Sequence, residues 1–192
     1  MDLKGKKIIL GSNSPRRRTL LTGLDIPFEV DTLNDFDEKY SPDTPYDMVP
    51  VLMSEGKSRG FHRPLEDDEI LITADTMVIL SDRILGKPHS REDAVSMLKA
   101  LSGHEHHVIT AVTLRDSSHM VTDTDTTQVR FRELSDEEID YYIDKYKPFD
   151  KAGAYGAQDW LGYSAITHIE GSFFNVVGLP VHKVYKMLKE FI

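Results

Sequence analysis

The sequence predicts an α/β or α+β protein in which a mixed sheet is flanked by helices. Short apolar runs of strand length alternate with amphipathic stretches of helix length along the chain, a pattern that favours mixed α and β structure. One pair of long alternating segments, joined near Ser117 and Ser118, is typical of an antiparallel hairpin. The 192 residues, of which 40% are hydrophobic, can bury a substantial core, and their number is typical of one domain or two closely merged lobes.

The first third of the chain predicts two strands and two helices. Residues 6–14 form a short apolar run followed by Gly, Ser and Asn, which is typical of a buried strand that ends in a loop. Residues 14–24 predict a helix with Ser14 as its cap, Pro15 in its first turn and Gly23 near its end. The other expected elements are a strand at 27–33, an acidic surface loop at 34–46 and a helix at 44–60 that Pro50 kinks or delays.

The rest of the chain follows from the same rules. Residues 69–80 predict a buried strand that the stretch Ala74-Asp75-Thr76 interrupts. Residues 90–103 predict a well-defined helix, capped by Ser90 and ended by Gly103. The further expected elements are a turn and short strand at 81–88, two long strands within 106–134, a capped helix at 135–146, a Gly/Ala-rich loop at 150–162, a strand at 164–171 and an amphipathic helix at 180–191.

Composition excludes several classes of function. The formal net charge of −9 argues against a general nucleic-acid-binding protein, which carries a basic footprint, although an acidic chain can still hold a basic pocket for a small anion. Because the chain has no cysteine, it forms no disulfide, thiol nucleophile or zinc–thiolate site. The apolar run near the N-terminus is too short for a secretory signal, and no run approaches membrane-spanning length. We therefore expect a soluble cytoplasmic protein that binds neither nucleic acid nor membrane.

Three arginines follow the cap of the first predicted helix. Arg16, Arg17 and Arg18 come directly after Ser14 and Pro15, at the positive end of the helix dipole, which disfavours cations. A bound anion would resolve this conflict, because free backbone N–H groups and the dipole bind phosphate and arginines bind it bidentately. The alternative is that all three side chains point into solvent.

Other segments also carry candidate residues, each with a structural alternative. Asp75 lies within a buried strand run, where it either caps a turn or marks the carboxyl end of a strand, the edge at which α/β sheets bind ligands. Lys87 is either a binding group or a solvated lysine in a hairpin. The loop at 150–158 either lets its backbone approach a ligand closely or is simply flexible. Asn175 and Gly178 are expected to shape a turn into the last helix.

The histidines in the stretch 104–107 raise the question of a metal. His104 and His106 share a face if this stretch is a strand, which would allow a metal pair. No nearby residue supplies a third ligand, and surface strands often carry such side chains. The chain also lacks the G-x-x-x-x-G-K-[ST] P-loop, the G-x-G-x-x-G fingerprint and the G-x-S-x-G elbow, which disfavours P-loop and Rossmann mechanisms.

Several segments are specific when they are taken together and in order. They run from about Ile8 to the C-terminus and include "ILGSNSPRRRTLLTGL", "FDE", "GKSRGF", "ITADTMVI", "ILGKP", "DKAGAYGAQ" and "GSFFNVVGLPV". In this order they resemble the Maf-like nucleoside triphosphate pyrophosphatases. The resemblance implies an elongated mixed sheet flanked by helices, similar to that of inosine triphosphatases, with two lobes and a central cleft, in a single domain over residues 1–192. It implies hydrolysis of dTTP and UTP, and of modified pyrimidine nucleotides, to the monophosphate and pyrophosphate with Mg²⁺ or Mn²⁺ in a house-cleaning role.

The resemblance also implies a set of substrate-binding residues. The set comprises Ser12, Arg16, Arg17, Lys57, Thr76, Lys87 and Gln158. Ser12, Arg16 and Arg17 match the family's phosphate-binding loop and helix start, so that the substrate's phosphates would occupy the helix end. Arg16, Thr76 and Gln158 match positions linked to nucleotide selection in the branch that prefers dTTP and UTP over 7-methyl-GTP. We expect these three side chains to hydrogen-bond the edge of the pyrimidine ring.

Two acids complete the implied site. Asp75 matches the proposed proton acceptor, which takes a proton from the water that attacks the α-phosphorus. Glu38 and Asp75 supply hard oxygen ligands that suit Mg²⁺ or Mn²⁺. The chain departs from the family's pattern at three positions, with Gly at 11 where Ala is common, and with Gly56 and Ser58 beside Lys57 in place of a bulkier residue and Ala.

Two other functions stay open on the sequence alone. One is a non-catalytic nucleotide-binding regulatory protein, which the full set of charged residues disfavours, because binding alone needs no Asp placed as a base. The other is a purine-selective house-cleaning pyrophosphatase, which Thr76 and Gln158 disfavour. The resemblance further implies a homodimer.

Overall fold

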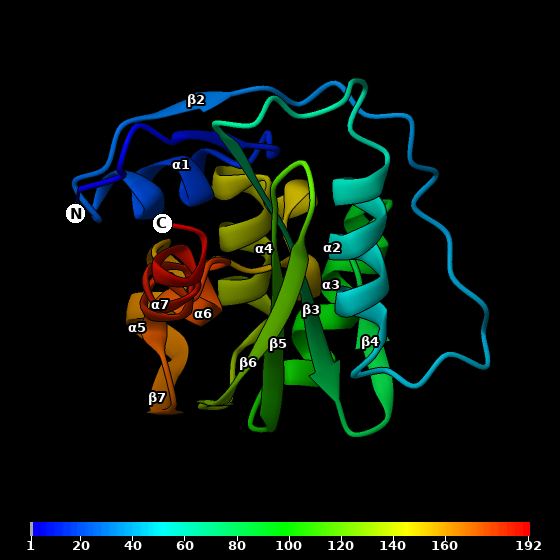
Figure 1. Ribbon diagram of the computed structural model, residues 1–192. Helices are drawn as coiled ribbons and strands as arrows, with labels where there is room; N and C mark the ends of the chain where they lie inside the picture. The colour runs from blue at the N-terminus through cyan, green and yellow to red at the C-terminus, as the bar shows by residue number, and fades with distance from the viewer. Residues whose placement is uncertain (1) are drawn as a thin grey trace. The chain divides into compact units, whose positions relative to one another are not determined.

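A computed structural model, which describes residues 2–192, contains seven strands and seven α-helices (Figure 1). The strands are β1 (Lys7–Leu10), β2 (Phe28–Val30), β3 (Glu69–Leu80), β4 (Arg83–Leu85), β5 (Glu105–Arg115), β6 (Met120–Phe131) and β7 (Ile166–Glu170). The helices are α1 (Pro15–Thr22), α2 (Val49–Arg59), α3 (Arg91–Leu101), α4 (Asp136–Tyr146), α5 (Trp160–Ala165), α6 (Phe173–Val177) and α7 (Val181–Phe191). Short 3₁₀ helices cover Pro148–Asp150 and Ala152–Ala154.

The strands form one mixed sheet. Its order is β2-β1-β3-β5-β6-β7, and β4 pairs with β3 outside this path. β1 is parallel to both β2 and β3, whereas the pairs β3–β4 and β6–β7 are antiparallel. The register places Leu10 opposite Ile72, so β3 continues beyond the end of β1. A mixed sheet with helices confirms the predicted fold class.

The chain packs into two compact units. The first contains residues 2–75, 110–125 and 178–192, and the second contains residues 76–109 and 126–177. Two units agree with the two predicted lobes. The single domain over residues 1–192 and the central cleft stay predictions.

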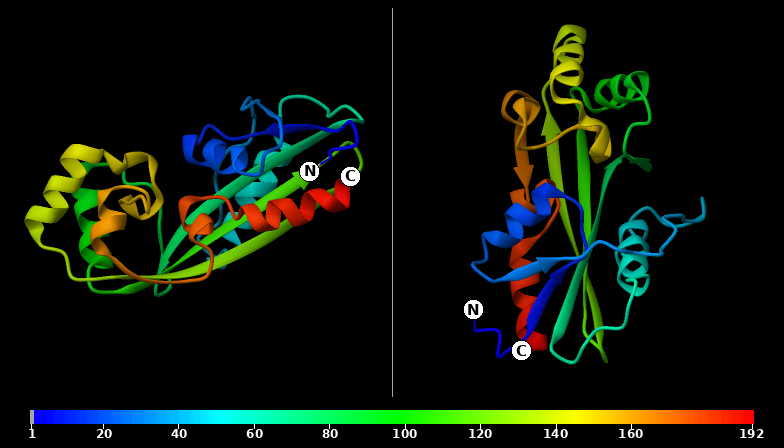
Figure 2. Two further views of the ribbon diagram at one scale, coloured as in Figure 1. Left: turned by 90° about the vertical axis from the view of Figure 1, so that its left-hand side faces the viewer. Right: turned by 90° about the horizontal axis from the view of Figure 1, so that it is seen from above.

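Strands of the first unit carry α1 and α7 on one face and α2 on the other (Figure 2). Residues buried at helical spacing on α7, namely Val184, Met187, Leu188 and Phe191, supply part of its core. On the α2 face, the buried Ser54 hydroxyl donates to the Thr73 carbonyl oxygen over 3.2 Å and lies 2.8 Å from Thr113 Oγ1. These polar contacts fix the position of α2 along the axis of β3, and they thereby position Lys57.

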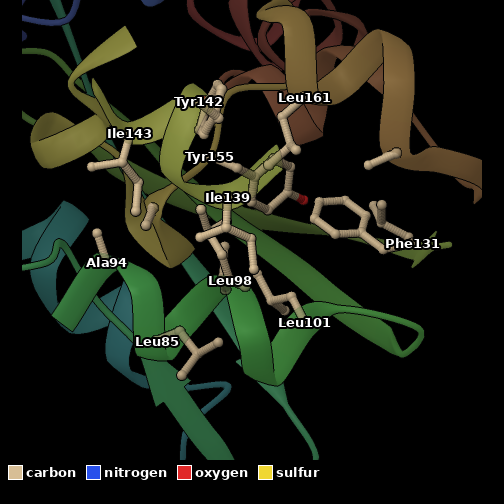
Figure 3. Close-up of a cluster of buried hydrophobic side chains, with 14 of the residues drawn as sticks. Leu85, Ala94, Leu98, Leu101, Phe131, Ile139, Tyr142, Ile143, Tyr155 and Leu161 are labelled. Atoms are coloured by element: carbon tan, nitrogen blue, oxygen red, sulfur yellow. The ribbon is translucent and has the colours of Figure 1, made fainter. Parts of the chain in front are cut away.

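The second unit is built on a large apolar cluster between α3, α4 and the strands (Figure 3). Its fully or nearly fully buried members include Leu98, Leu101, Phe131, Ile139, Tyr142, Tyr155 and Leu161. Local signals start the helices as predicted, because Ser90 Oγ accepts from Asp93 N at 3.1 Å and Ser135 forms a capping box with Glu138. Gly103 follows α3 with a φ of 71°, which suits a helix stop.

Three predictions about elements need correction. β3 runs unbroken through Ala74-Asp75-Thr76, because Asp75 meets the charge of Lys57 and so stays within the strand. The predicted loop at 150–162 contains two 3₁₀ helices and the start of α5. Ser164 and Ala165 belong to α5 and not to the following strand. For Pro50, by contrast, one of the two predicted alternatives is confirmed, because it lies in the first turn of α2 and so delays the start of the helix.

None of the helices within residues 2–192 combines the length and the apolar character that a membrane span requires.

Candidate active site

The loop between β1 and α1 passes close to β3. Gly11 N donates to the Ile72 carbonyl oxygen over 2.9 Å. A Cβ atom at Gly11 would lie 3.0 Å from Thr73 Cγ2, so the lack of a side chain at residue 11 permits the close approach. The loop thereby places Ser12, which is 7% exposed, beside the part of β3 that leads to Asp75.

Arg17 does not point into solvent. Ser14 Oγ accepts from Arg17 N at 3.4 Å as the predicted N-cap, and Arg17 Nη1 donates to Ser12 Oγ over 3.4 Å. Arg17 Nε donates to the Gly178 carbonyl oxygen over 2.8 Å. Burial lowers the pKa of Arg17, and the negative charges of Asp75 and Glu38 oppose this shift. The solvent alternative is therefore wrong for Arg17, whose charge faces two acids and stabilises the loop.

Lys57 joins the two predicted acids. Its Nζ atom lies 2.6 Å from Asp75 Oδ1 and 3.2 Å from Glu38 Oε2. α2 supplies Lys57, β3 supplies Asp75, and the segment between β2 and α2 supplies Glu38. The side chains of Asp75 and Lys57 are 11% and 18% exposed, whereas that of Glu38 is 57% exposed. Three residues that are far apart in the sequence thus form one charged cluster in the first unit.

The carboxylates of this cluster fit a divalent cation. Asp75 Oδ2 is buried and has no hydrogen-bond partner among the described residues, although buried polar atoms nearly always have one. Glu38 lies near enough to share the same lysine. Residues 2–192 contain no group of three or more His, Cys, Asp or Glu side chains arranged for a metal. This donor set suits Mg²⁺, which proteins often hold through one or two carboxylates while substrate phosphates and water complete the shell.

Three of the predicted binding residues belong to the second unit. Thr76 follows Asp75 on β3 and is partly buried, while Lys87 and Gln158 are exposed. The segments that carry Lys87 and Gln158 meet, because Gly153 N donates to the Gly86 carbonyl oxygen over 3.0 Å. Gly153 has a φ of 67°, a conformation that favours glycine. The binding roles of these three residues stay predictions.

A polar network that the sequence did not predict holds the loop before Gln158. Tyr142 OH donates to Asp159 Oδ2 over 2.9 Å and accepts from Gly156 N at 3.0 Å. Lys151 Nζ lies 3.6 Å from Asp159 Oδ2, and its side chain is 13% exposed. Burial raises the pKa of Tyr142, which therefore stays protonated as a donor. The sequence did offer one sign of this network, because Lys151 and Asp159 are charged residues within a Gly/Ala-rich stretch. Charged side chains need partners when they are buried.

His104 and His106 do not form the metal pair that their spacing left open. His104 precedes β5, is exposed and places Nδ1 2.7 Å from the Ser102 carbonyl oxygen. His106 is fully buried, and its Nε2 lies 2.7 Å from Tyr155 OH. Its ring also meets the rings of Phe131 and Tyr155 edge-on. His106 therefore supports Tyr155 in the loop that leads to Gln158.

His106 is expected to make the stability of the chain depend on pH. Burial lowers its pKa from 6.5 to about 3, so the unfolded chain binds more protons than the folded one between these values. Stability then falls as the pH drops below 6.5, by about 2 kcal/mol between pH 7 and pH 5 from this group alone. Urea unfolding should show that His106→Gln reduces the loss, whereas His104→Gln leaves it unchanged. Equal losses in His106→Gln and the parent chain would contradict this assignment.

Comparisons with known proteins show the family of the chain. The family model described as "Maf-like protein" matches residues 7–191. A protein of Parabacteroides distasonis named dTTP/UTP pyrophosphatase is 51% identical over 99% of this chain and 98% of its own length. Proteins with the same name from Porphyromonas gingivalis and Bacteroides thetaiotaomicron are each 47% identical, over 99% and 98% of this chain and 96% and 98% of their own lengths.

A solved structure of a HAM1 protein from Coxiella burnetii aligns with 66% of this chain and 73% of its own, with a TM-score of 0.42 and 11% identity. That similarity is too low to support an inference about this chain. The family match and the identities cover almost the whole sequence. The chain therefore belongs to the Maf-like protein family.

Proposed function

We propose that this protein hydrolyses dTTP and UTP, and modified pyrimidine nucleoside triphosphates, to the monophosphate and pyrophosphate. The observation that carries the proposal is the cluster in which Lys57 contacts both Asp75 and Glu38. The relatives named dTTP/UTP pyrophosphatase support this choice of substrate. A house-cleaning role in the cytoplasm and a homodimeric state belong to the same proposal, and light scattering would test the homodimer.

The cations of the first unit suit a triphosphate. α1 begins with Ser14 as its cap, and its N-terminal backbone N–H groups favour an anion. Arg16 and Arg17 lie in the first turn of this helix, and Lys57 lies beside Asp75. We propose that these side chains bind the phosphates and stabilise the charge that develops as pyrophosphate leaves, which is the main task in such reactions. Lys87 is proposed to add a further positive charge.

Glu38 and Asp75 are proposed to hold Mg²⁺ or Mn²⁺. When bound, the metal would neutralise phosphate charge and make water more acidic. The buried oxygen of Asp75 that has no partner, and the two carboxylates held by one lysine, support this role. Lys57 then also limits the repulsion between the two acids.

The proposed reaction proceeds by direct attack of water. The water oxygen forms a bond to the α-phosphorus while the bond from that phosphorus to the bridging oxygen of the β-phosphate breaks. The monophosphate and pyrophosphate are the two products. Asp75 accepts the proton of the attacking water at its carboxylate. Ser12 and Arg17 hold the phosphate-binding loop in place during the reaction.

A panel of nucleoside triphosphates tests the proposal. Pyrophosphate release is measured with dTTP, UTP, modified pyrimidine nucleotides, ATP, GTP, ITP and 7-methyl-GTP, each with Mg²⁺ and with Mn²⁺. We expect the largest kcat/KM for dTTP and UTP, and no turnover when EDTA is present. Nucleotide binding without pyrophosphate release would favour a regulatory protein. A preference for ITP would favour a purine-selective enzyme.

Gln158→Ala is expected to relax base choice more than it lowers overall turnover. Gln158 is exposed at the end of the loop that Tyr142 and Asp159 hold, and a side chain that pairs with the edge of a base penalises bases that do not match it. The ratio of kcat/KM for dTTP to that for dCTP should fall about tenfold, which corresponds to about 1.4 kcal/mol. Equal losses for every nucleotide would count against a role in base selection.

A further inference from the structure

The segment that carries Glu38 is attached to α2 through a pair of glycines. Gly56 and Gly60 are one helical turn apart, and the side chain of Phe36 lies against both. A Cβ atom at Gly56 would overlap the ring of Phe36, and one at Gly60 would lie 2.7 Å from Phe36 Cβ and 2.8 Å from Phe36 N. Real Cβ atoms essentially never make contacts under 3.0 Å. Phe36 can therefore occupy this position only because both residues are glycine.

Hydrogen bonds attach the same segment to the end of α2. Asp35 N donates to the Gly60 carbonyl oxygen over 2.8 Å, and Phe36 N donates to Asn34 Oδ1 over 2.8 Å. Asn34 Nδ2 in turn donates to the carbonyl oxygen of Lys57. The backbone of residues 34–36 is thus bound to the stretch of helix that begins at Lys57.

Glu38 follows this attachment by two residues and reaches the side chain of Lys57, with 3.2 Å between Oε2 and Nζ. The Glu38 side chain is more than half exposed, so its own contacts hold it weakly. Glycine inside a helix is less stable than alanine. Gly56 therefore lowers the stability of α2, unless another side chain occupies the space that the Cβ atom would fill. The half-buried Phe36 ring fills that space.

We infer that Phe36, packed on Gly56 and Gly60, is the positioning residue for Glu38 and holds this carboxylate at Lys57 and Asp75. The inference rests on the proposed function, in which Glu38 and Asp75 hold the divalent metal. Gly56 and Phe36 form a matched pair, because the ring occupies the volume that a larger side chain would fill.

Two measurements on Gly56→Ala test the inference. Hydrogen exchange on the metal-free protein reports the attachment, and the amides of Asp35 and Phe36 should exchange at least about tenfold faster than in the parent chain. Titration with Mn²⁺ followed by electron paramagnetic resonance reports the carboxylates, and the Kd for Mn²⁺ should rise about fivefold to tenfold. Gly23→Ala is the matched control, because it adds the same methyl group at the end of α1, where only the Leu20 carbonyl oxygen lies near. It should change neither readout.

A second set of variants separates positioning from general damage to the fold. Phe36→Ala removes the ring without adding a clash and should raise the Kd for Mn²⁺ to a similar extent, so it serves if Gly56→Ala folds poorly. Adding Gly56→Ala to Phe36→Ala should cause little further loss, since the new methyl group then has room. Adding Gly56→Ala to Glu38→Gln should also cause no further loss, because the affected ligand is already absent.

The inference would be overturned if Gly56→Ala changed neither the hydrogen exchange nor the Kd for Mn²⁺ while Glu38→Gln weakened Mn²⁺ binding. Faster exchange with an unchanged Kd would also overturn it, because the packing would then not position Glu38. Failure of the proposed function looks different. The parent chain would then release no pyrophosphate from dTTP or would bind no Mn²⁺. Hydrogen exchange would still show whether the packing of Phe36 depends on glycine at residue 56.

Discussion

Asp75→Asn is expected to lower kcat for pyrophosphate release from dTTP by about 10²- to 10⁴-fold, the usual contribution of a positioned general base. Asparagine has nearly the same size as aspartate but accepts no proton. It also removes the negative charge that pairs with Lys57 at 2.6 Å. Binding of metal-free dTTP should change little, because in the proposed reaction the phosphates contact the cations and not Asp75, whereas the Kd for Mn²⁺ should rise, because Asp75 is also a proposed metal ligand.

Single-turnover kinetics and a direct binding assay with dTTP separate these effects. Asp68→Asn is a matched control, because Asp68 forms an exposed ion pair with Lys7 at 2.7 Å and such pairs contribute little to stability. It should keep full activity and the parent melting temperature. A kcat of Asp75→Asn within tenfold of that of the parent chain would contradict the assignment of Asp75 as the proton acceptor.

Gly162→Ala is expected to cause the largest loss of stability among the glycine variants considered. A Cβ atom at Gly162 would lie 2.7 Å from Ala157 Cα and closer still to the carbonyl group of Ala157. These are backbone atoms, so no side-chain rotation relieves the overlap, and α5 or the loop beside Gln158 has to move. Overpacking of this kind costs about 3 kcal/mol, which lowers the melting temperature of a chain of this size by about 6–12 °C.

Calorimetry measures this loss, and Gly86→Ala is its control. A Cβ atom at Gly86 would meet nothing within 4 Å, so that variant should melt within about 2 °C of the parent chain. Because Ala157 precedes Gln158, the Gly162→Ala variant should also lose selectivity for dTTP at temperatures where it remains folded. A melting temperature equal to that of the parent would show that α5 accommodates a methyl group at this position.

The parts of the fold that the sequence predicted depend on local signals. α3 and α4 begin at Ser90 and Ser135 because a cap and its partner lie within three residues of each other. The hairpin of β5 and β6 followed from alternation on either side of Ser117. The continuity of β3 could not be predicted in this way, because the charge that stabilises Asp75 within the strand comes from Lys57, 18 residues earlier.

The site was predicted as a set of residues but not as a set of contacts. The resemblance supplied Ser12, Arg17, Glu38, Lys57 and Asp75, and in the structure Arg17 hydrogen-bonds to Ser12 while Lys57 contacts Glu38 and Asp75. It did not indicate that one lysine contacts both acids. The support of the loop before Gln158 was missed as well, since His106 and Tyr155 are 49 residues apart and no local pattern links them.

The bond from Arg17 to the carbonyl oxygen of Gly178 has a consequence for how the protein is made. The Gly178 carbonyl group is translated 161 residues after Arg17, and the whole of α7 is translated later still. The first unit is assembled from three separate stretches and the second from two, so neither can be produced alone as one uninterrupted piece. The loop between β1 and α1 therefore gains this support only after residue 178 has been synthesised, and nascent chains that stop earlier should hold Arg17 less firmly.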